Sequence, residues 1–458
     1  MKLFNKILIA NRGEIAVRII RACKELDIKT VSVYSDIEKD TMHVRLSDES
    51  ICIGPATPLQ SYLNIPAILT AAEITDTQAI HPGYGFLSEN PHFAETCISS
   101  GIVFIGPTPE NIRLGGDKAK ARQIMRRRGI PIVPGSDGPV QSVEMALKVS
   151  KKIGFPVILK ASQGGGGRGM KVVSEEEGIE QAFYMAQREA LTAFGNNELY
   201  VEKYIPEPRH IEVQVMADSK GNIIHLGERD CSIQRRHQKL IEESPSPFST
   251  DKFRKKLCEL GVKAARALRY RNLGTVEFIV DPEGNIYFME MNTRIQVEHP
   301  VTEAVTGIDL IKEQIRLAAG FPLIYKQSQI KPKGHAIECR INAEDPEKFI
   351  PSPGKITFFY PPGGPGVRVD TASFSGAVVP SEYDSLVAKL IVHGGDRQEA
   401  LSKAKRALDE FIIEGIKTTI PFHKKVLSST DFINGNFTTT FVDKLNGREK
   451  TVETAPLE

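Results

Sequence analysis

The 458-residue chain contains no tryptophan, only six cysteines and almost no net charge, since 59 Lys+Arg residues oppose 57 Asp+Glu residues. None of the cysteines forms a Cys-x-x-Cys pair, which excludes a zinc knuckle and a disulfide framework and predicts free thiols. A net charge of +2 argues against nucleic-acid binding over the whole chain, because such binding needs a basic surplus. No run of about 18 uncharged apolar residues occurs, and the apolar stretch at the start is too short for a secretory signal. We therefore expect a cytoplasmic protein without a membrane span.

The order of apolar runs and turn signals predicts about three domains. In residues 1–114, short apolar runs alternate with helical patterns, which is typical of an open, mostly parallel α/β sheet. Residues 115–330 have the pattern of an α+β domain with two antiparallel hairpins. Residues 331–447 combine strands, among them GKITFFY, with an amphipathic helix around 398–412 that we expect to be the final one. A short tail, 448–458, follows.

Four consecutive glycines occur in the segment VILKASQGGGGRGMKVV. Gly164, Gly166 and Gly169 match G-x-G-x-x-G, but a strand-like run follows them instead of the helix that a dinucleotide or phosphate loop requires. The segment therefore predicts a flap between two strands, whose backbone N–H groups close over phosphates while Lys160 supplies a positive charge. Protein kinases carry a similar flap, but Asp-Phe-Gly is absent from this chain. The alternative is a simple mobile hairpin tip.

A second motif, TVEFIVDPEGNIYFMEMNTR, has two apolar strands around the turn signal at 281–284. A turn centred on Glu283-Gly284 places Glu277 opposite Glu290, and two like charges in that position repel unless a cation bridges them. Alternation along the strand puts Asn292 on the same face, so the three side chains form an oxygen ligand set suited to Mg²⁺ or Mn²⁺. The alternative is a solvated strand face.

The segment that follows, NTRIQVEHPVTE, brings a cation, an amide and a carboxylate close to this site through Arg294, Gln296 and Glu298. A carboxylate beside an arginine is suited to act as a base toward a small oxyacid whose anion the arginine then holds. A structural ion pair between Arg294 and Glu298 is the alternative. The basic stretch at 234–239, QRRHQK, lacks aromatic residues and is more typical of an anion-facing loop than of a nucleic-acid patch.

Taken together, these motifs resemble the biotin carboxylase component of biotin-dependent carboxylases, a branch of the ATP-grasp superfamily. The resemblance extends over nearly the whole chain and rests on IANRGEIAVRIIRACKEL, AIHPGYGFLSEN, KASQGGGGRGMKVV, EKYIPEPRHIEVQV, GERDCSIQRRHQK, MEMNTRIQVEHPVTE, ECRINAEDP and YDSLVAKLI. It implies an ATP-grasp fold with an N-terminal Rossmann-like domain (1–114), an ATP-grasp domain (115–330) and a C-terminal biotin carboxylase domain (331–447). A mobile lid over about 132–204 is implied to carry the glycine loop.

The resemblance also implies the reaction and the residues that perform it. Bicarbonate attacks the γ-phosphate of ATP to give carboxyphosphate, which decomposes to CO₂ and phosphate, and CO₂ then carboxylates biotin. The implied nucleotide-binding residues are Lys118, Lys160, Gly164, Gly165, Gly166, Gly167, Glu202, Lys203, Tyr204, Ile205, His210, Gln234, His237, Glu277, Ile279 and Glu290. Glu277, Glu290 and Asn292 are implied to hold divalent metal, two ions of Mg²⁺ or Mn²⁺.

For the second substrate, the resemblance implies that bicarbonate is held by Lys239, Arg294, Gln296 and Val297. Glu298 is implied to be the base. Biotin is implied to lie against Tyr84, Arg294 and Arg340. Gln163 and Pro365 depart from the family pattern; Pro365 stands where relatives often have an aromatic residue near their dimer contact.

We expect a dedicated subunit, because no Ala-Met-Lys-Met biotinylation turn or carboxyltransferase segment occurs in the sequence. The implied partners are a biotin carboxyl carrier protein, a carboxyltransferase and a second copy of the chain, with no nucleic acid and no membrane. The first interpretation is the biotin carboxylase of acetyl-CoA carboxylase in fatty acid synthesis, followed closely by the subunit of a two-subunit pyruvate or 2-oxo acid carboxylase. A different ATP-grasp carboxylate-amine ligase and a nucleotide sensor without turnover are two less favoured hypotheses.

Overall fold

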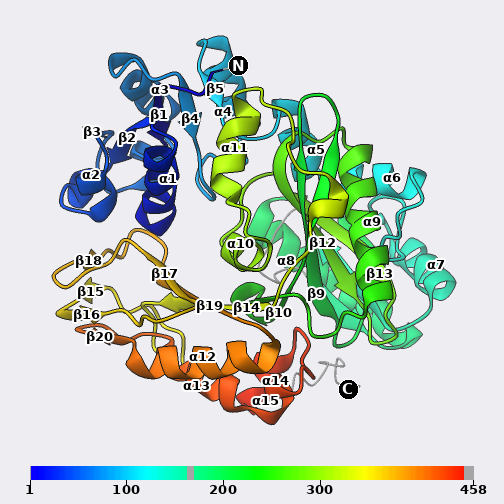
Figure 1. Cartoon of the computed structure of the whole chain (residues 1–458). Coiled ribbons are helices and arrows are strands. Elements are labelled where there is room, and N and C mark those ends of the chain that lie inside the picture. Colours follow the sequence, from blue (N-terminus) through cyan, green and yellow to red (C-terminus); the bar gives the residue numbers. More distant parts are fainter. Residues whose placement is uncertain (1, 162–169, 448–458) are drawn as a thin grey trace.

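A parallel five-stranded sheet occupies the amino-terminal part of the computed structural model, which describes residues 2–161 and 170–447 (Figure 1). The strand order is β3-β2-β1-β4-β5, and all four neighbouring pairs are parallel, so the predicted α/β sheet is confirmed. Its elements are β1 (Lys6–Ile9), α1 (Gly13–Glu25), β2 (Lys29–Tyr34), α2 (Met42–Leu46), β3 (Glu49–Cys52), α3 (Ile65–Ile74), β4 (Ala79–His81), α4 (Pro91–Ser99), β5 (Val103–Phe104) and α5 (Pro109–Gly116).

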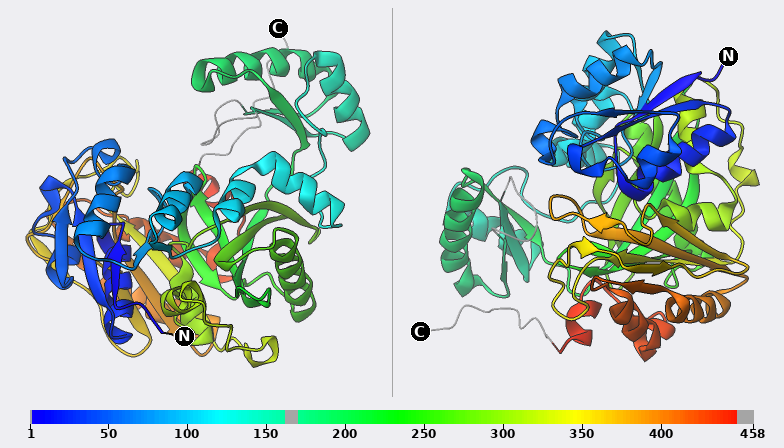
Figure 2. Two further views of the ribbon diagram at one scale, coloured as in Figure 1. Left: turned by 90° about the horizontal axis from the view of Figure 1, so that it is seen from above. Right: turned by 90° about the vertical axis from the view of Figure 1, so that its left-hand side faces the viewer.

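A small antiparallel sheet with two helices stands apart from the rest of the molecule in both views of Figure 2. It follows α6 (Lys118–Arg127) and consists of α7 (Val143–Ile153), β6 (Val157–Ala161), β7 (Met170–Val173), α8 (Ile179–Phe194) and β8 (Leu199–Lys203), with strand order β7-β6-β8. Lys160 pairs with Met170 across β6 and β7, as expected for a loop that joins two strands. The glycines Gly164, Gly165, Gly166 and Gly167 lie outside the described residues.

An eight-stranded antiparallel sheet forms the centre of the molecule, in the order β13-β12-β9-β10-β11-β14-β19-β17. Its first part contains β9 (Arg209–Ala217), β10 (Ile223–Arg235), β11 (Gln238–Ser244), α9 (Asp251–Ala267), β12 (Asn272–Val280), β13 (Ile286–Asn292), α10 (His299–Thr306) and α11 (Leu310–Ala318). Its second part contains β14 (His335–Asn342), β17 (Val367–Thr371) and β19 (Leu386–Gly394). Because β11 pairs with β14, one sheet continues across the domain boundary that we expected between residues 330 and 331.

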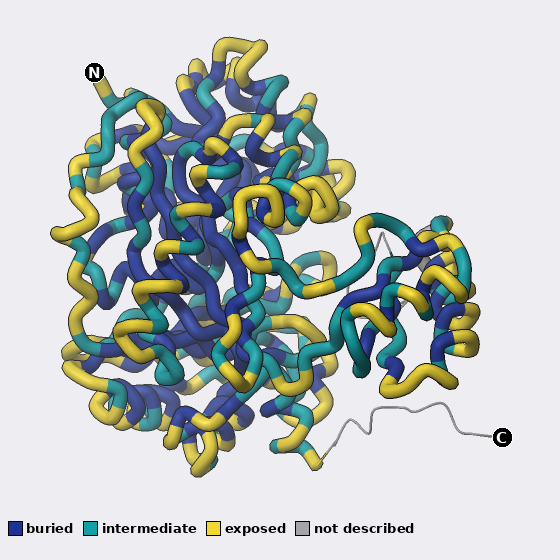
Figure 3. The backbone as a smooth tube through the Cα atoms, turned by 90° about the vertical axis from the view of Figure 1, so that its right-hand side faces the viewer, coloured by how far each residue is buried: buried dark blue, intermediate teal, exposed yellow. Residues whose placement is uncertain are grey.

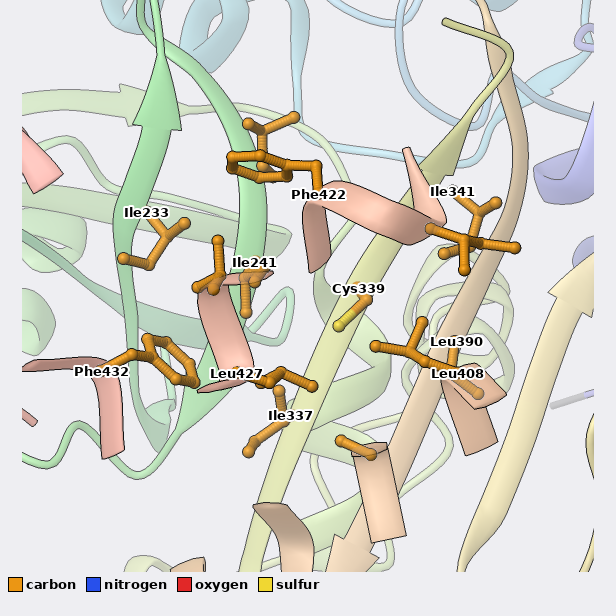
Figure 4. Close-up of a cluster of buried hydrophobic side chains, with 14 of the residues drawn as sticks. Ile233, Ile241, Ile337, Cys339, Ile341, Leu390, Leu408, Phe422, Leu427 and Phe432 are labelled. Carbon is orange, nitrogen blue, oxygen red and sulfur yellow. The ribbon is translucent and has the colours of Figure 1, made fainter. Parts of the chain in front are cut away.

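The carboxyl-terminal helices cover one face of this sheet. They are α12 (Arg397–Glu410), α13 (Ile420–Ser428), α14 (Thr430–Ile433) and α15 (Phe441–Leu445). Figure 4 shows the apolar cluster between these helices and the strands, in which Ile337 and Cys339 of β14 lie near Leu390, Leu427 and Phe432. This tightly packed core of strand and helix residues holds the sheet in a fixed position.

Two sequence predictions in this region were wrong. The run GKITFFY does not form one strand, because β15 (Gly354–Lys355) pairs with β18 (Val378–Val379) whereas β16 (Phe358–Tyr360) pairs with β20 (Ile412–Glu414). The helix predicted to be the last one ends at Glu410, and within the described part of the chain, up to residue 447, three further helices follow it. The β-branched Ile412 and Ile413 enter β20 instead, where a partner strand outweighs the helical periodicity.

Figure 3 shows buried strands running through the middle of the molecule, and β9 is one of them. All nine residues of β9 are buried, although Arg209, His210, Glu212 and Gln214 are polar. Buried polar side chains need partners, so this strand indicates a polar network inside the sheet. The six cysteines are free, as predicted. Among the described helices, none is long and apolar enough to cross a membrane.

Strand β14 also buries Glu338, whose two carboxylate oxygens have no hydrogen-bond partner among the described residues. Burial raises the pKa of this carboxyl well above its ordinary value, against the lowering effect of Lys389, and the neighbouring Glu242 raises it further. The folded protein therefore keeps a proton that the unfolded chain releases, so this group costs stability as the pH rises above the unfolded pKa.

The variant Glu338→Gln stays neutral at every pH, so we expect it to lose less stability than the parent as the pH rises above the ordinary pKa of a glutamate. Melting temperatures of the two proteins at several pH values measure the difference. The exposed Glu347→Gln controls for the loss of one acidic group in the same part of the chain. A gap between parent and Glu338→Gln that does not widen with pH would mean that Glu338 is already ionised in the folded protein.

Candidate active site

A cavity of about 1980 Å³ lies where the amino-terminal sheet, the small sheet and the eight-stranded sheet meet. Every predicted site residue that the structure describes lines it: Tyr84, Lys118, Lys160, Glu202, Lys203, Tyr204, Ile205, His210, Gln234, His237, Lys239, Glu277, Ile279, Glu290, Asn292, Arg294, Gln296, Val297, Glu298 and Arg340. Predicted residues up to 256 positions apart in the sequence, from Tyr84 to Arg340, therefore share one chamber. The glycines of the predicted flap lie outside the described residues.

The predicted pair of acids is formed by β12 and β13, where Glu277 lies opposite Glu290. Between the turn and the acids the register differs from the prediction, because Val280 pairs with Ile286 and a bulge follows between Phe278 and Glu277. The turn is therefore one residue tighter than expected, and the bulge restores the predicted register at the acids. Asn292 lies near them, and its amide nitrogen donates to Glu277 Oε1 at 2.7 Å.

Lys239 of β11 holds three buried carboxylates together. Its Nζ lies 2.6 Å from Glu212 Oε2, 2.8 Å from Glu277 Oε1 and 2.6 Å from Glu298 Oε1. Although burial opposes the charged form, these acids raise the pKa of Lys239 well above its ordinary value. One ammonium group thus connects the predicted metal acid Glu277 to the predicted base Glu298.

Two buried residues of this network, Glu212 and Arg229, were missed by the sequence analysis. The Arg229 guanidinium is fully buried and donates to Glu212 Oε1 at 2.6 Å and to Gln296 Oε1 at 2.9 Å. Since the Gln296 oxygen is occupied, its NH₂ group points the other way and donates to Glu277 Oε1 at 2.8 Å. The sequence did contain a sign of these buried polar residues, namely the alternation of polar and apolar residues in HIEVQV.

Glu298 has a second cationic partner in Arg340, whose Nη2 lies 2.9 Å from Glu298 Oε2. Burial acts to raise the pKa of Glu298, but Lys239 and Arg340 outweigh it and hold the pKa below its ordinary value. Glu298 is therefore ionised at neutral pH, which is the state that accepts a proton. Arg340 is itself fixed by Glu242, which accepts from Arg340 Nε at 2.6 Å.

Arg294 approaches the same region from the loop after β13. Its Nε donates to Glu89 Oε2 at 3.0 Å, and its Nη2 lies 3.4 Å from Asn292 Oδ1. The alternative interpretation, a direct ion pair between Arg294 and Glu298, does not hold, because Glu298 pairs with Lys239 and Arg340 whereas Arg294 pairs with Glu89. Glu89, in the amino-terminal part of the chain, is a further partner that sequence spacing gave no reason to select.

The other end of the cavity combines positive charge with apolar walls. Lys160 Nζ lies 2.6 Å from Glu202 Oε2, and Arg122 pairs with the other oxygen of this carboxylate. The walls around them include Ile158, Val172, Ile279, Phe288 and Met289. These apolar walls, here called the apolar slot, with a few polar groups beside them, are typical of a site for a ring that carries phosphates.

The remaining predicted residues differ in how they face the cavity. Lys203 lines it, but its ammonium donates to the carbonyl oxygens of Gly154 and Phe155 at 3.1 and 2.7 Å. His210 Nε2 lies 3.0 Å from Glu277 Oε2, so His210 contacts the acid pair more directly than the apolar slot. Gln234 Nε2 lies 3.5 Å from His210 Nδ1. His237 has a positive φ of 66° in the turn between β10 and β11.

The chemistry of Glu277, Glu290 and Asn292 fits a divalent cation with oxygen ligands. In the structure each acid has a lysine ammonium beside it, since Lys239 contacts Glu277 at 2.8 Å and Lys118 contacts Glu290 at 2.7 Å. The acids thus stabilise positive charge at these two positions. The two ammonium groups also offset the repulsion that we expected between the opposed carboxylates.

Three family models match successive parts of the chain. They are "Biotin carboxylase, N-terminal domain" over residues 3–112, "Carbamoyl-phosphate synthase L chain, ATP binding domain" over residues 117–326, and "Biotin carboxylase C-terminal domain" over residues 338–444. Among curated relatives, a biotin carboxylase of Allochromatium vinosum is 55% identical over 97% of this chain and 99% of its own length. Biotin carboxylase 1 of Bacillus subtilis is 56% identical over 96% and 98%.

Solved structures give the same result. The biotin carboxylase of Campylobacter jejuni, in a complex described as β-γ-ATP, matches with a TM-score of 0.92 at 54% identity over 96% of this chain and 99% of that one. The biotin carboxylase domain dimer of Hydrogenobacter thermophilus 2-oxoglutarate carboxylase, with MgADP, ADP and bicarbonate, matches at 0.91 and 52% over 97% and 98%. A biotin carboxylase subunit of pyruvate carboxylase matches at 0.86 and 52% over 96% and 98%. The chain therefore belongs to the biotin carboxylase family, ATP-dependent ligases with an ATP-grasp fold.

Proposed function

We propose that this chain carboxylates biotin on a separate carrier protein, using ATP and bicarbonate, as the first half-reaction of acetyl-CoA carboxylase. The observation that supports this proposal best is that, within one cavity, Lys239 contacts both Glu277, the predicted metal ligand, and Glu298, the predicted base. A phosphate site and an oxyacid site that share one lysine are suited to joining bicarbonate to the γ-phosphate of a nucleotide.

At the nucleotide end, Lys118 and Lys160 neutralise phosphate oxygens, and the apolar slot around Ile279 takes the adenine ring. Glu277, Glu290 and Asn292 hold Mg²⁺ or Mn²⁺, which supplies charge neutralisation at the phosphates. Of the similar structures, the Campylobacter jejuni protein is described with an ATP complex and the Hydrogenobacter thermophilus domain with MgADP. These descriptions support the same nucleotide site in this chain.

At the other end, Lys239, Arg294 and the Gln296 amide hold bicarbonate near Val297. Glu298 removes its proton, and the bicarbonate oxygen attacks the γ-phosphorus as the bond to ADP breaks, which gives carboxyphosphate and ADP. Carboxyphosphate separates into CO₂ and phosphate, and phosphate takes the ureido proton of biotin. The biotin anion then attacks CO₂. Fixed cations in a site screened from water stabilise each of these anions more strongly than they do in solution.

Biotin lies against Tyr84, with Arg294 and Arg340 positioned to stabilise the charge that develops on its ureido oxygen. Arg340 already holds Glu242 and Glu298 in the structure, so its guanidinium is fixed before a substrate arrives. A preorganised cation costs no rearrangement when the charge develops. The biotin arrives on a carrier protein, and we expect no covalent biotin on this chain.

We also propose a homodimer, because one closely similar structure is described as a dimer of biotin carboxylase domains. Pro365 is exposed in this chain, at the place where we expected a dimer contact. The cytoplasmic location stays a prediction.

The acceptor of the carboxyl group defines a second candidate function. The similarity to biotin carboxylases of 2-oxoglutarate carboxylase and pyruvate carboxylase, both at 52% identity, favours a subunit of a 2-oxo acid carboxylase as the alternative. The acceptor is chosen on the carboxyltransferase, so isolation of the native complex and mass spectrometry of its subunits decide between the two. The same spectra test the carrier, since biotin on this chain would contradict a separate carrier.

The half-reaction itself is tested by ATP hydrolysis by the purified chain. We expect hydrolysis to require bicarbonate and Mg²⁺ and to increase when free biotin is added, because biotin consumes the CO₂ that carboxyphosphate releases. Hydrolysis that ignores bicarbonate, or that biotin leaves unchanged, would favour a different ATP-grasp ligase.

The role of Glu298 as base predicts a selective loss. We expect Glu298→Gln to lower kcat of bicarbonate-dependent hydrolysis at least about 100-fold, because a general base contributes about 10²–10⁴ to a rate. Affinity for MgADP, measured by calorimetry, should stay within about threefold, since Glu298 does not touch the nucleotide end. Glu344→Gln, which removes another carboxylate from the cavity wall, is the matched control and should retain kcat. Equal losses in the two variants would remove Glu298 from the chemistry.

A further inference from the structure

A fully buried lysine, Lys389, lies beside the site and has no role in the mechanism above. It is 0% exposed and stands on β19 directly opposite Arg340 of β14. Its Nζ donates to the Val297 carbonyl oxygen at 2.9 Å. Because cross-strand partners face the same side of a sheet, Lys389 and Arg340 hold consecutive residues, Val297 and Glu298.

The contact with Val297 orients the base. Since the peptide bond is planar, a carbonyl oxygen fixed by Lys389 also fixes the direction of the Glu298 backbone nitrogen. The Glu298 carboxylate is then held from the other end by Lys239 and Arg340. Lys389 therefore acts on Glu298 through the backbone, without touching its side chain.

Glu14 connects Lys389 to the biotin side of the cavity. This residue lies in the first turn of α1, and its side chain is 2% exposed. Glu14 Oε1 lies 3.1 Å from Lys389 Nζ and also accepts a hydrogen bond from the Tyr84 hydroxyl. Its Oε2 has no hydrogen-bond partner among the described residues. A buried carboxylate bonded through one oxygen depends on both of its donors, so loss of either donor changes its hold on the other.

We propose that Glu14 and Lys389 are positioning residues that couple the biotin side of the site to the bicarbonate side. The coupling runs from the Tyr84 hydroxyl through Glu14 and the Lys389 ammonium to the Val297 carbonyl. It joins the loop after β4, α1, β19 and the loop before α10, four segments of the chain. This inference rests on the proposed function, which assigns Tyr84 to biotin and Val297 to bicarbonate.

The first test is Lys389→Met in ATP hydrolysis without biotin. Loss of the contact to Val297 is expected to raise KM for bicarbonate about tenfold while KM for ATP stays within about twofold. Lys403→Met is the matched control, because the Lys403 ammonium also bonds a backbone carbonyl, His393 O at 2.9 Å, and a glutamate, Glu399, but outside the cavity. A melting temperature that falls in both variants with no change of KM for bicarbonate in Lys389→Met would reduce Lys389 to a structural residue.

The second test is a double-mutant cycle with Tyr84→Phe, which removes only the hydroxyl donor. We expect Tyr84→Phe to change KM for bicarbonate even without biotin, because Glu14 then has Lys389 as its single donor. In the Lys389→Met background this effect on bicarbonate should disappear, since the connection is already cut. Two effects that multiply independently, or a Tyr84→Phe variant with unchanged KM for bicarbonate, would overturn the proposed coupling.

Glu14→Gln keeps the inference testable if Lys389→Met does not fold. The amide keeps an acceptor oxygen but removes the charge, so KM for biotin and KM for bicarbonate are both expected to rise. A change confined to one of them would contradict the coupling.

The parent protein distinguishes failure of the proposed function from failure of the coupling. If ATP hydrolysis by the parent does not depend on bicarbonate, the proposed function is wrong and the coupling is wrong with it. If the parent is active and all variants keep its KM values, only the coupling is overturned.

Discussion

The site depends on one constraint, the burial of several carboxylates within a few ångströms of one another. Glu212, Glu277 and Glu298 all lie within 2.8 Å of the same ammonium group, that of Lys239. Two like charges about 4 Å apart repel by about 4 kcal/mol at an effective dielectric constant of about 20. Such a cluster is stable only where cations of fixed position compensate its negative charge. The surrounding strands β10, β11 and β14 carry these cations.

The compensating cations come from distant parts of the chain. Arg229 of β10 neutralises Glu212 from one side, and Arg340 of β14 contacts Glu298 from the other. Because β11 and β14 pair directly, the central and carboxyl-terminal parts of the chain share one sheet, and the distance between Lys239 and Arg340 is set by strand spacing. A continuous sheet holds these groups more rigidly than two domains joined by a linker would. The sheet therefore fixes the positions of the cations that stabilise the buried carboxylates.

Three lysines of the cavity are suited to the anionic substrates that we propose. Lys118, Lys160 and Lys239 each rest on a carboxylate in the structure, namely Glu290, Glu202 and Glu277. A phosphate or a small oxyanion that enters exchanges one anionic partner for another, so the lysines need not be desolvated anew. In the function that we propose, a divalent cation would take the place of the ammonium groups at Glu277 and Glu290, and Lys239 and Lys118 would then be free to contact substrate. The pair of Glu14 and Lys389 extends this arrangement to the amino-terminal wall of the cavity, which Glu14 lines while Lys389 stays fully buried.

Features that arise from neighbouring residues could be predicted from the amino-acid sequence. A turn signal and two apolar strands predicted the hairpin and the opposition of Glu277 and Glu290, although a tighter turn and a bulge beside Glu277 produce that register. The strand that follows the glycine segment was also predicted. The parallel amino-terminal sheet followed from alternating apolar runs for the same reason. Family resemblance then selected the cavity residues, including Lys118 and Arg340, that no spacing argument connects.

Contacts between residues that are far apart in the sequence became visible once the chain was folded. The alternation in HIEVQV hints at buried polar residues, but nothing in it says that Glu212 contacts Arg229 and Lys239. Nor does any local pattern pair Glu14 with Lys389, which are brought together by the packing of α1 against the carboxyl-terminal strands. Strand β20 likewise replaced the end of a predicted helix because a partner strand was present. Local sequence sets backbone preference and strand register, whereas the pairing of buried charges depends on which surfaces pack together, and that is a property of the whole fold.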